Sequence, residues 1–310
     1  MYDSVEFKLG SEAAKGVDFL SETPCYFDVK GEHNYKGNIV ITGYKDNLKV
    51  SVSNSGVKVS NGSLCKYLLG DNLQTLTRGD VKKAIEKLSD GLHLPIDKAN
   101  VTRIDAGCSI ILNHEPKLYL NHLGNLNHYN RFLQDGSLYF QNSKRQLVFY
   151  DKIRELKAKK EPVPELYQNR NVLRYEMRFT KRLSHEFNIS EVVASTLYNE
   201  TFYEALYSRW FNEYKQVNKI FESSLNFEQM NTKRDFYMAG LQSIIKTEGG
   251  ELAMCQKLEE CYKRGLYTRK QFHDLKQAFK EAASFKIETV ENPLVKELDK
   301  KMAETAKFYR

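Results

Sequence analysis

The chain has 310 residues, of which 41% are hydrophobic and 28% are charged, as is typical of a soluble globular protein. No run of about 18 apolar residues occurs, which excludes a membrane-spanning helix. The N-terminus alternates like a strand and lacks the basic start and apolar stretch of a signal peptide. We therefore expect a cytoplasmic protein with no membrane partner, built as one large domain or two domains of ordinary size.

Positive charge is concentrated in one part of the chain. Of the 47 basic and 40 acidic residues, 12 basic and 5 acidic residues lie between positions 144 and 182, and the remainder holds 35 of each. The net charge of +7 therefore belongs to this segment. Such a concentration favours a polyanionic partner, most often nucleic acid. A solvated protein surface would show the same pattern.

The N-terminal part of the chain reads as strands. Residues 2–9 alternate as a first strand, and residues 36–60 form strand-like runs separated by polar turns, which predicts an antiparallel meander. Thr77 followed by Asp80 predicts the start of a helix that extends to about Leu88.

A strand over residues 101–110 carries an acidic residue in its middle. Alternation puts one set of side chains on a single face, namely Arg103, Asp105, Gly107 and Ser109. Aspartate is disfavoured inside strands, so Asp105 is either a satisfied structural carboxylate or a ligand for a cation.

The basic segment reads as a hairpin followed by a second strand with an acidic residue in its middle. Residues 138–152 predict two strands around a polar turn that contains Lys144 and Arg145, and two prolines then open a basic loop. Residues 171–179 alternate again. Their polar side chains share one face and are Arg174, Glu176 and Arg178.

After Ile189 the pattern becomes helical. An apolar stripe recurs at helical spacing through Leu206, Trp210, Tyr214, Val217 and Phe221. Further helices are predicted after Thr232, after Gly250, from the capping box at Thr268, and from Pro293. Residues 251–284 fit a helix-turn-helix motif, but we favour plain helix packing, because their length and period fit many pairs of antiparallel helices.

These patterns predict an α+β fold. An N-terminal antiparallel-sheet domain with flanking helices covers residues 1–188, and a helical C-terminal region covers residues 189–310.

Asp105 and Glu176 supply the oxygen ligands that Mg²⁺ or Mn²⁺ prefers, and Tyr150 at the end of the hairpin supplies a nucleophilic hydroxyl. Each feature also has a structural explanation. A tyrosine at a strand end usually packs, and each carboxylate is able to pair with a neighbouring arginine.

Three segments in chain order carry a family resemblance. They are Arg103-Ile104-Asp105, Tyr150-Asp151-Lys152-Ile153-Arg154-Glu155 and Arg174-Tyr175-Glu176. This arrangement resembles the replication initiation proteins of the filamentous-phage gene II/X family, encoded by phages and plasmids. More distantly it is similar to rolling-circle plasmid initiators that share the order R-x-D, Y-x-K-x-x-E and R-x-E. The likeness is strongest over residues 101–188.

The resemblance implies a metal-dependent nicking-closing enzyme that cuts one strand at an origin, with residues 1–188 as its catalytic domain. Tyr150 would be the nucleophile that takes the 5′-phosphate, with Lys152 beside the scissile phosphate. Asp105 and Glu176 would hold Mg²⁺ or Mn²⁺. The expected DNA contacts are Arg103, Lys144, Arg145, Arg154, Arg174 and Arg178.

The chain departs from many related nickases because it has no His-hydrophobe-His motif, which leaves the full metal shell open. A second nucleophilic tyrosine is not identifiable, although Tyr139 and Tyr129 lie nearby in the sequence. The expected partners are origin DNA, as a single-stranded or cruciform nick site, and host replication proteins including a helicase. The oligomeric state stays open, with a homodimer as one expectation.

Two other functions fit the same residues. A metal-dependent nuclease would use Asp105, Glu176 and Arg178 with water as the nucleophile and would form no covalent intermediate. A non-enzymatic origin-binding protein would use the basic hairpin to hold phosphates and would cut nothing.

Overall fold

The computed structural model describes residues 1–181, 183–220, 231–285 and 292–309. The chain divides into two compact units. The first comprises Met1–Leu120, Asn125–Asn218 and Asp299–Arg310, and the second comprises Asn121–Gly124 and Lys219–Leu298. This division does not coincide with the boundary expected after residue 188, because helix α7 (Glu200–Gln216) belongs to the first unit and packs on its sheet.

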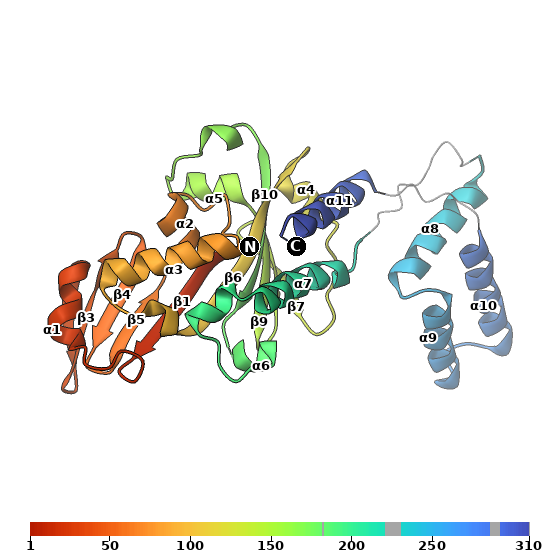
Figure 1. Cartoon of the computed structure of the whole chain (residues 1–310). Helices are drawn as coiled ribbons and strands as arrows, with labels where there is room; N and C mark the ends of the chain where they lie inside the picture. The colour runs from red at the N-terminus through yellow and green to blue at the C-terminus, as the bar shows by residue number, and fades with distance from the viewer. Residues whose placement is uncertain (182, 221–230, 286–291, 310) are drawn as a thin grey trace. The chain divides into compact units, whose positions relative to one another are not determined.

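In the described part of the chain, ten strands form one sheet in the order β2-β3-β4-β5-β1-β6-β10-β9-β8-β7, with every neighbouring pair antiparallel (Figure 1). The strands are β1 (Tyr2–Gly10), β2 (Asp28–Tyr35), β3 (Asn38–Lys45), β4 (Leu48–Ser53), β5 (Gly56–Ser60), β6 (Asn100–Leu112), β7 (Asn130–Gln134), β8 (Ser137–Gln141), β9 (Arg145–Asp151) and β10 (Asn171–Phe179). The expected meander and hairpin are confirmed, whereas β2 and β7 had not been predicted.

Helices connect and follow these strands, which confirms the α+β class. Those of the first unit are α1 (Phe19–Glu22), α2 (Leu64–Leu69), α3 (Arg78–Leu92), α4 (Pro116–Leu120), α5 (Lys152–Ala158), α6 (Leu183–Phe187) and α7, with the short 3₁₀ turns η1 (Thr23–Tyr26), η2 (Ile96–Lys98), η3 (Glu165–Tyr167) and η4 (Ala194–Tyr198). None of the described helices is long and apolar enough to span a membrane.

One face of the central strands carries the aromatic core. Phe149 of β9 stacks on Tyr175 of β10 with ring centroids 4.3 Å apart, and Tyr175 stacks on Trp210 of α7 at 5.0 Å. Tyr175 Oη also donates a hydrogen bond to the backbone oxygen of Trp210. Leu206 and Tyr214 are buried with Trp210, as the apolar stripe predicts, and Phe221 lies outside the described residues. Because alternate residues of a strand face opposite ways, this packing also fixes the neighbours that face away from α7.

The second unit is helical in its described residues. It contains α8 (Lys233–Thr247), α9 (Glu251–Lys263), α10 (Arg269–Ser284) and the first residues of α11 (Pro293–Phe308). All four starts agree with the sequence prediction, and capping boxes begin α8 at Thr232 and α10 at Thr268. Helix α10 contacts both α8 and α9, which is compatible with plain helix packing.

A capping box also begins α3, and it yields a test of the fold. The side chain of Thr77 accepts a hydrogen bond from Asp80 N, and Oδ2 of Asp80 accepts one from Thr77 N. The Thr77 hydroxyl also donates a hydrogen bond to Asp80 Oδ2 at 2.7 Å, and this bond lowers the pKa of Asp80. A carboxylate with a lowered pKa stabilises the fold above its unfolded pKa, and this contribution is lost as the pH falls through the folded value.

We predict that Thr77→Ala lowers the free energy of unfolding by about 1 kcal/mol at pH 7. In urea titrations the difference from the wild type should shrink below about pH 3.9, the ordinary pKa of aspartate. Thr268→Ala is the matched control, because the partner of Thr268 is the uncharged Gln271. A Thr77→Ala difference that is the same at pH 7 and pH 3 would contradict the role of the Asp80 charge.

Candidate active site

The face of the sheet that points away from α7 carries a buried polar cluster. Four neighbouring strands contribute to it, in the order β1, β6, β10 and β9. Arg174 pairs with Tyr150 across β10 and β9, and Arg178 pairs with Asp105 across β10 and β6. The antiparallel register therefore brings together residues from three separate sequence motifs.

Tyr150 is hydrogen-bonded to Glu176. Its hydroxyl donates to Glu176 Oε1 at 2.7 Å, across the diagonal of the β9 and β10 pair. Burial raises the pKa of Tyr150 well above 10, and the negative charge of Glu176 raises it further. The phenol is thus neutral in this structure and oriented toward a carboxylate.

Arg174 lies at the centre of the cluster with no exposed surface. Its Nη2 forms an ion pair with Asp3 Oδ2 at 2.9 Å, its Nε donates to Glu176 Oε1 at 3.2 Å, and its Nη1 donates to Ser109 Oγ at 3.1 Å. This corrects the DNA contact expected from the sequence. Burial removes Arg174 from the surface, so it positions carboxylates instead.

Arg178 connects Glu176 to Asp105. Its Nη2 and Nε donate to Glu176 Oε2 at 2.8 and 3.1 Å, and its Nε lies 4.0 Å from Asp105 Oδ2. Burial alone would raise the pKa of Glu176, but Arg174 and Arg178 together lower it to about 2. Glu176 is therefore a stable carboxylate in a buried setting.

Asp105 is held by its neighbour on the same strand. Arg103 donates to Oδ1 at 2.8 Å and to Oδ2 at 2.7 Å. Burial raises the pKa of Asp105 to about 6, even though Arg103 opposes that shift. Gly107, directly opposite Glu176, leaves the room the cluster needs, since a Cβ there would lie 2.9 Å from Glu176 Cγ. The shared face predicted for Arg103, Asp105 and Gly107 is thus confirmed.

Asp3 was missed by the sequence reasoning. It is 5% exposed and accepts a hydrogen bond from Ser63 Oγ at 2.6 Å, besides its ion pair with Arg174. An irregularity in the pairing of β1 with β6, between Tyr2 and Ser4, accommodates it. The signal was available, because Asp3 is an acidic residue inside a predicted strand, as Asp105 is.

Lys152 is buried and paired with Glu155. It is the first residue of α5 and is 1% exposed, and its Nζ donates to Glu155 Oε2 at 2.8 Å. The same nitrogen lies 5.9 Å from the centroid of the Tyr150 ring. Lys152 thus lies beside the tyrosine ring with its charge directed to Glu155.

The turn before β9 contacts helices. Arg145 pairs with Glu213 of α7 and with Glu186 of α6, and Lys144 lies 3.9 Å from Glu186. Arg145 begins β9 and is roughly 17 Å along the strand from Tyr150. These two residues, expected to contact DNA, therefore stand apart from the cluster, whereas Arg154 is exposed on α5.

A pocket of about 330 Å³ opens onto the cluster. It is lined by Asp3, Ser4, Ser63, Asn72, Asp105, Ser137, Tyr139, Val148, Tyr150, Glu155, Lys159, Glu176 and Arg178. Tyr139 is the second tyrosine in it and stacks on Phe132 with ring centroids 5.0 Å apart. Both the tyrosine and the acidic residues proposed from the sequence thus face one cavity.

The donor chemistry of the pocket fits a hard divalent cation. Magnesium is commonly bound through one or two carboxylates, with water and substrate phosphates completing the shell. Asp105 and Glu176 supply such carboxylates. Across the described ranges, no group of three or more His, Cys, Asp or Glu residues is arranged to hold a metal. An ion would also have to compete with Arg103 and Arg178 for the same oxygens.

Comparison with known proteins identifies the family. A family model described as the N-terminal region of the replication-associated protein encoded by phage gene II matches residues 1–199, which is more than half of the chain and includes every strand of the sheet described above. No curated protein sequence matches the chain. The chain therefore belongs to the filamentous-phage gene II family of replication-associated proteins, which are initiators of rolling-circle replication.

Proposed function

We propose that this initiator nicks one strand of its origin by attack of Tyr150 on a phosphodiester. The observation that supports this is the Tyr150 hydroxyl, which is bonded to Glu176 in a pocket lined by cations and carboxylates. The bond from Tyr150 Oη to phosphorus forms, and the bond from phosphorus to the 3′ oxygen breaks. A 5′-phosphotyrosine and a free 3′-OH result, and the retained ester energy allows later closing.

Glu176 is the group placed to receive the phenol proton. The raised pKa of Tyr150 and the lowered pKa of Glu176 both oppose proton transfer in the free protein. The proton therefore leaves as the bond to phosphorus forms, when the oxygen becomes more acidic. Arg178 lines the pocket with its side chain 26% exposed, so it is able to contact the phosphate while it keeps Glu176 ionised.

The proposed cofactor is Mg²⁺ or Mn²⁺ held by Asp105 and Glu176. When bound, the ion would polarise the phosphate and offset the charge that develops on it. Oε1 of Glu176 accepts the hydrogen bond from Tyr150, while Oε2 accepts from Arg178, whose Nε also lies 4.0 Å from Asp105 Oδ2. One carboxylate thus has separate oxygens for the phenol and for a cation.

Origin DNA is the substrate of a replication initiator. The proposed DNA contacts are Arg103, Arg154 and Arg178, all of which retain exposed surface, with Lys152 supporting the Tyr150 ring. A host helicase, other host replication proteins and a second copy of the chain are further predicted partners.

One observation favours a second candidate function. The raised pKa of Tyr150 makes the phenol a poor nucleophile. A hydrolytic nuclease would use water instead, with Tyr150 as a hydrogen-bond donor and no covalent product.

Tyr150→Phe should abolish a covalent protein–DNA adduct. Supercoiled origin DNA and Mn²⁺ are incubated with the protein and analysed on denaturing gels without protease. Tyr139→Phe is the matched control, since Tyr139 lines the same pocket, and it should leave the adduct in place. Nicking by the wild type without any adduct would favour hydrolysis, and an adduct that survives Tyr150→Phe would move the nucleophile to another residue.

Glu176→Gln should reduce nicking at least about 100-fold, because the amide cannot take the proton. Origin binding, measured by fluorescence anisotropy, should be retained. Glu186→Gln is the control, because Glu186 is also a buried carboxylate held by arginines but contacts Arg145 and Arg209. Unchanged nicking by Glu176→Gln would remove Glu176 from the reaction.

Asp105→Asn should weaken Mn²⁺ binding at least about tenfold, since it removes a charged ligand. The binding is measured by electron paramagnetic resonance on Tyr150→Phe protein with a single-stranded origin oligonucleotide, so no turnover is needed. The Glu186→Gln substitution again serves as the control. Equal Mn²⁺ affinities in the Asp105→Asn and control proteins would refute the proposed metal site.

A further inference from the structure

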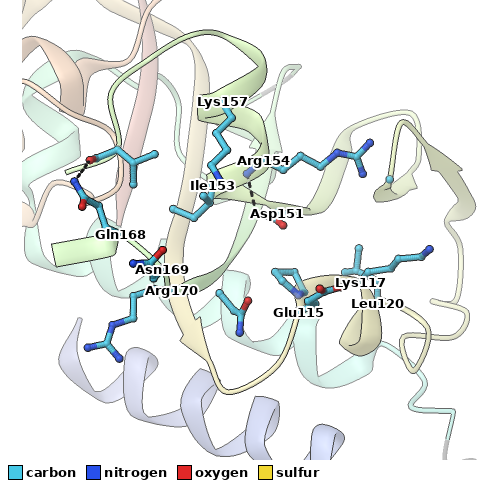
Figure 2. Close-up of a pocket in the computed structure, with 14 residues that line it drawn as sticks. Glu115, Lys117, Leu120, Asp151, Ile153, Arg154, Lys157, Gln168, Asn169 and Arg170 are labelled. Carbon is cyan, nitrogen blue, oxygen red and sulfur yellow. Dashed lines mark hydrogen bonds between the residues drawn. The ribbon is translucent and has the colours of Figure 1, made fainter. Parts of the chain in front are cut away.

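A second and larger pocket lies next to the active-site pocket in the first unit, with a volume of about 870 Å³ (Figure 2). Helix α5 lies between the two, because Glu155 and Lys159 line the smaller pocket whereas Arg154 and Lys157 line the larger one. The chain neighbours of two residues in the smaller pocket also reach the larger one. Asp151 follows Tyr150, and Gly136 precedes Ser137, so the two linings are adjacent along the chain at both places.

Four basic side chains line this second pocket from three parts of the chain. They are Lys117 of α4, Arg154 and Lys157 of α5, and Arg170 just before β10. All four are exposed, and none forms an ion pair with another residue that the structure describes. In contrast, Arg145 and Arg174 are neutralised by carboxylates. Cations without acidic partners in a concave surface attract an anion.

The acidic residues of the pocket do not cancel this charge. Its lining includes Glu115 and Asp151. Asp151 caps α5 by accepting a hydrogen bond from the backbone N of Arg154 at 2.9 Å (Figure 2). One of the two carboxylates is therefore already used within the fold, and the pocket keeps a positive excess.

The rest of the lining suits nucleobases. Amide side chains, which both donate and accept hydrogen bonds, come from Gln168, Asn169 and Asn171. Apolar surface comes from Pro116, Leu120, Ile153 and Val163. Unpaired bases expose both their faces and their hydrogen-bonding edges, whereas a duplex keeps them stacked and paired. A concave pocket of this composition therefore fits a single strand better than a duplex.

The wall of the pocket is anchored to the core. Val163 and Tyr167 pack against a buried cluster formed by Leu73, Leu156 and Val172. The loop between α5 and β10 is thereby held in place, so the pocket is formed before any ligand binds.

We propose that this pocket binds the single-stranded DNA that flanks the phosphate cut at Tyr150. The basic residues contact the phosphates, and the amide and apolar side chains contact the bases. The proposal rests on the nicking function above, which supplies a strand that must pass Tyr150. Because residues of α5 line both pockets, a strand cut at Tyr150 would reach the larger pocket with the nucleotides next to the cut.

The test uses the double variant Lys117→Ala/Arg170→Ala, whose residues lie outside the tyrosine motif, in the Tyr150→Phe background. Fluorescence anisotropy measures its affinity for a labelled origin oligonucleotide, single-stranded or duplex, across a salt series. Affinity for the single strand should fall about tenfold, and the log–log salt slope should decrease by about 1.4, which is about 0.7 per lost phosphate contact. Duplex affinity should change much less.

Lys83→Ala/Lys98→Ala is the matched control, because it removes the same charge from exposed lysines that do not line the pocket. Single-strand affinity equal to that of the control would overturn the proposal, and so would an equal loss for both DNA forms. The nicking function is judged separately by the adduct formed with Tyr150 present. If the adduct forms but the double variant keeps its single-strand affinity, only the proposed binding pocket is refuted. If the double variant loses single-strand affinity but no adduct forms, only the proposed attack by Tyr150 is refuted.

Discussion

The candidate active site depends on a buried guanidinium. Arg174 has no exposed surface and contacts both Asp3 and Glu176, which lie on different strands and far apart in the sequence. Removing one member of such a buried group leaves an uncompensated charge, at a cost of about 3–5 kcal/mol. The charged side chains of Asp3, Arg174 and Glu176 therefore stabilise one another. Their pairing holds the Glu176 carboxylate in the position where it contacts Tyr150.

The hydrophobic face of the same strands supports this polar face. Phe149 precedes Tyr150 in β9, and Tyr175 precedes Glu176 in β10, and the two aromatic rings stack at 4.3 Å. A slip of one residue would turn the tyrosine and the carboxylate toward α7 and the aromatic rings toward the pocket. The aromatic stack therefore specifies the register on which the bond from Tyr150 to Glu176 depends.

Many of the strands and the acidic residues on their polar faces could be predicted from the sequence, because strand alternation is a local property. It placed Asp105 and Glu176 on the polar faces of β6 and β10, and it predicted the helix starts from their caps. Asp3 carries the same local signal as Asp105, an acidic residue inside a predicted strand, but its ion pair with Arg174 depends on an irregular pairing of β1 with β6, which that signal does not reveal. Strand β2 was missed for a similar reason, because its sequence contains glycine and polar residues and its pairing with β3 makes it a strand.

The distribution of positive charge shows what a count of basic residues conceals. In the segment from 144 to 182, several of the basic residues are committed to carboxylates, including Arg145, Lys152, Arg174 and Arg178. Composition treats these as equivalent to Arg154, Lys157 and Arg170, although a paired and buried arginine offers little field to a ligand. The unpaired positive charge of the segment therefore lies mainly on side chains that line the larger pocket and on other exposed lysines.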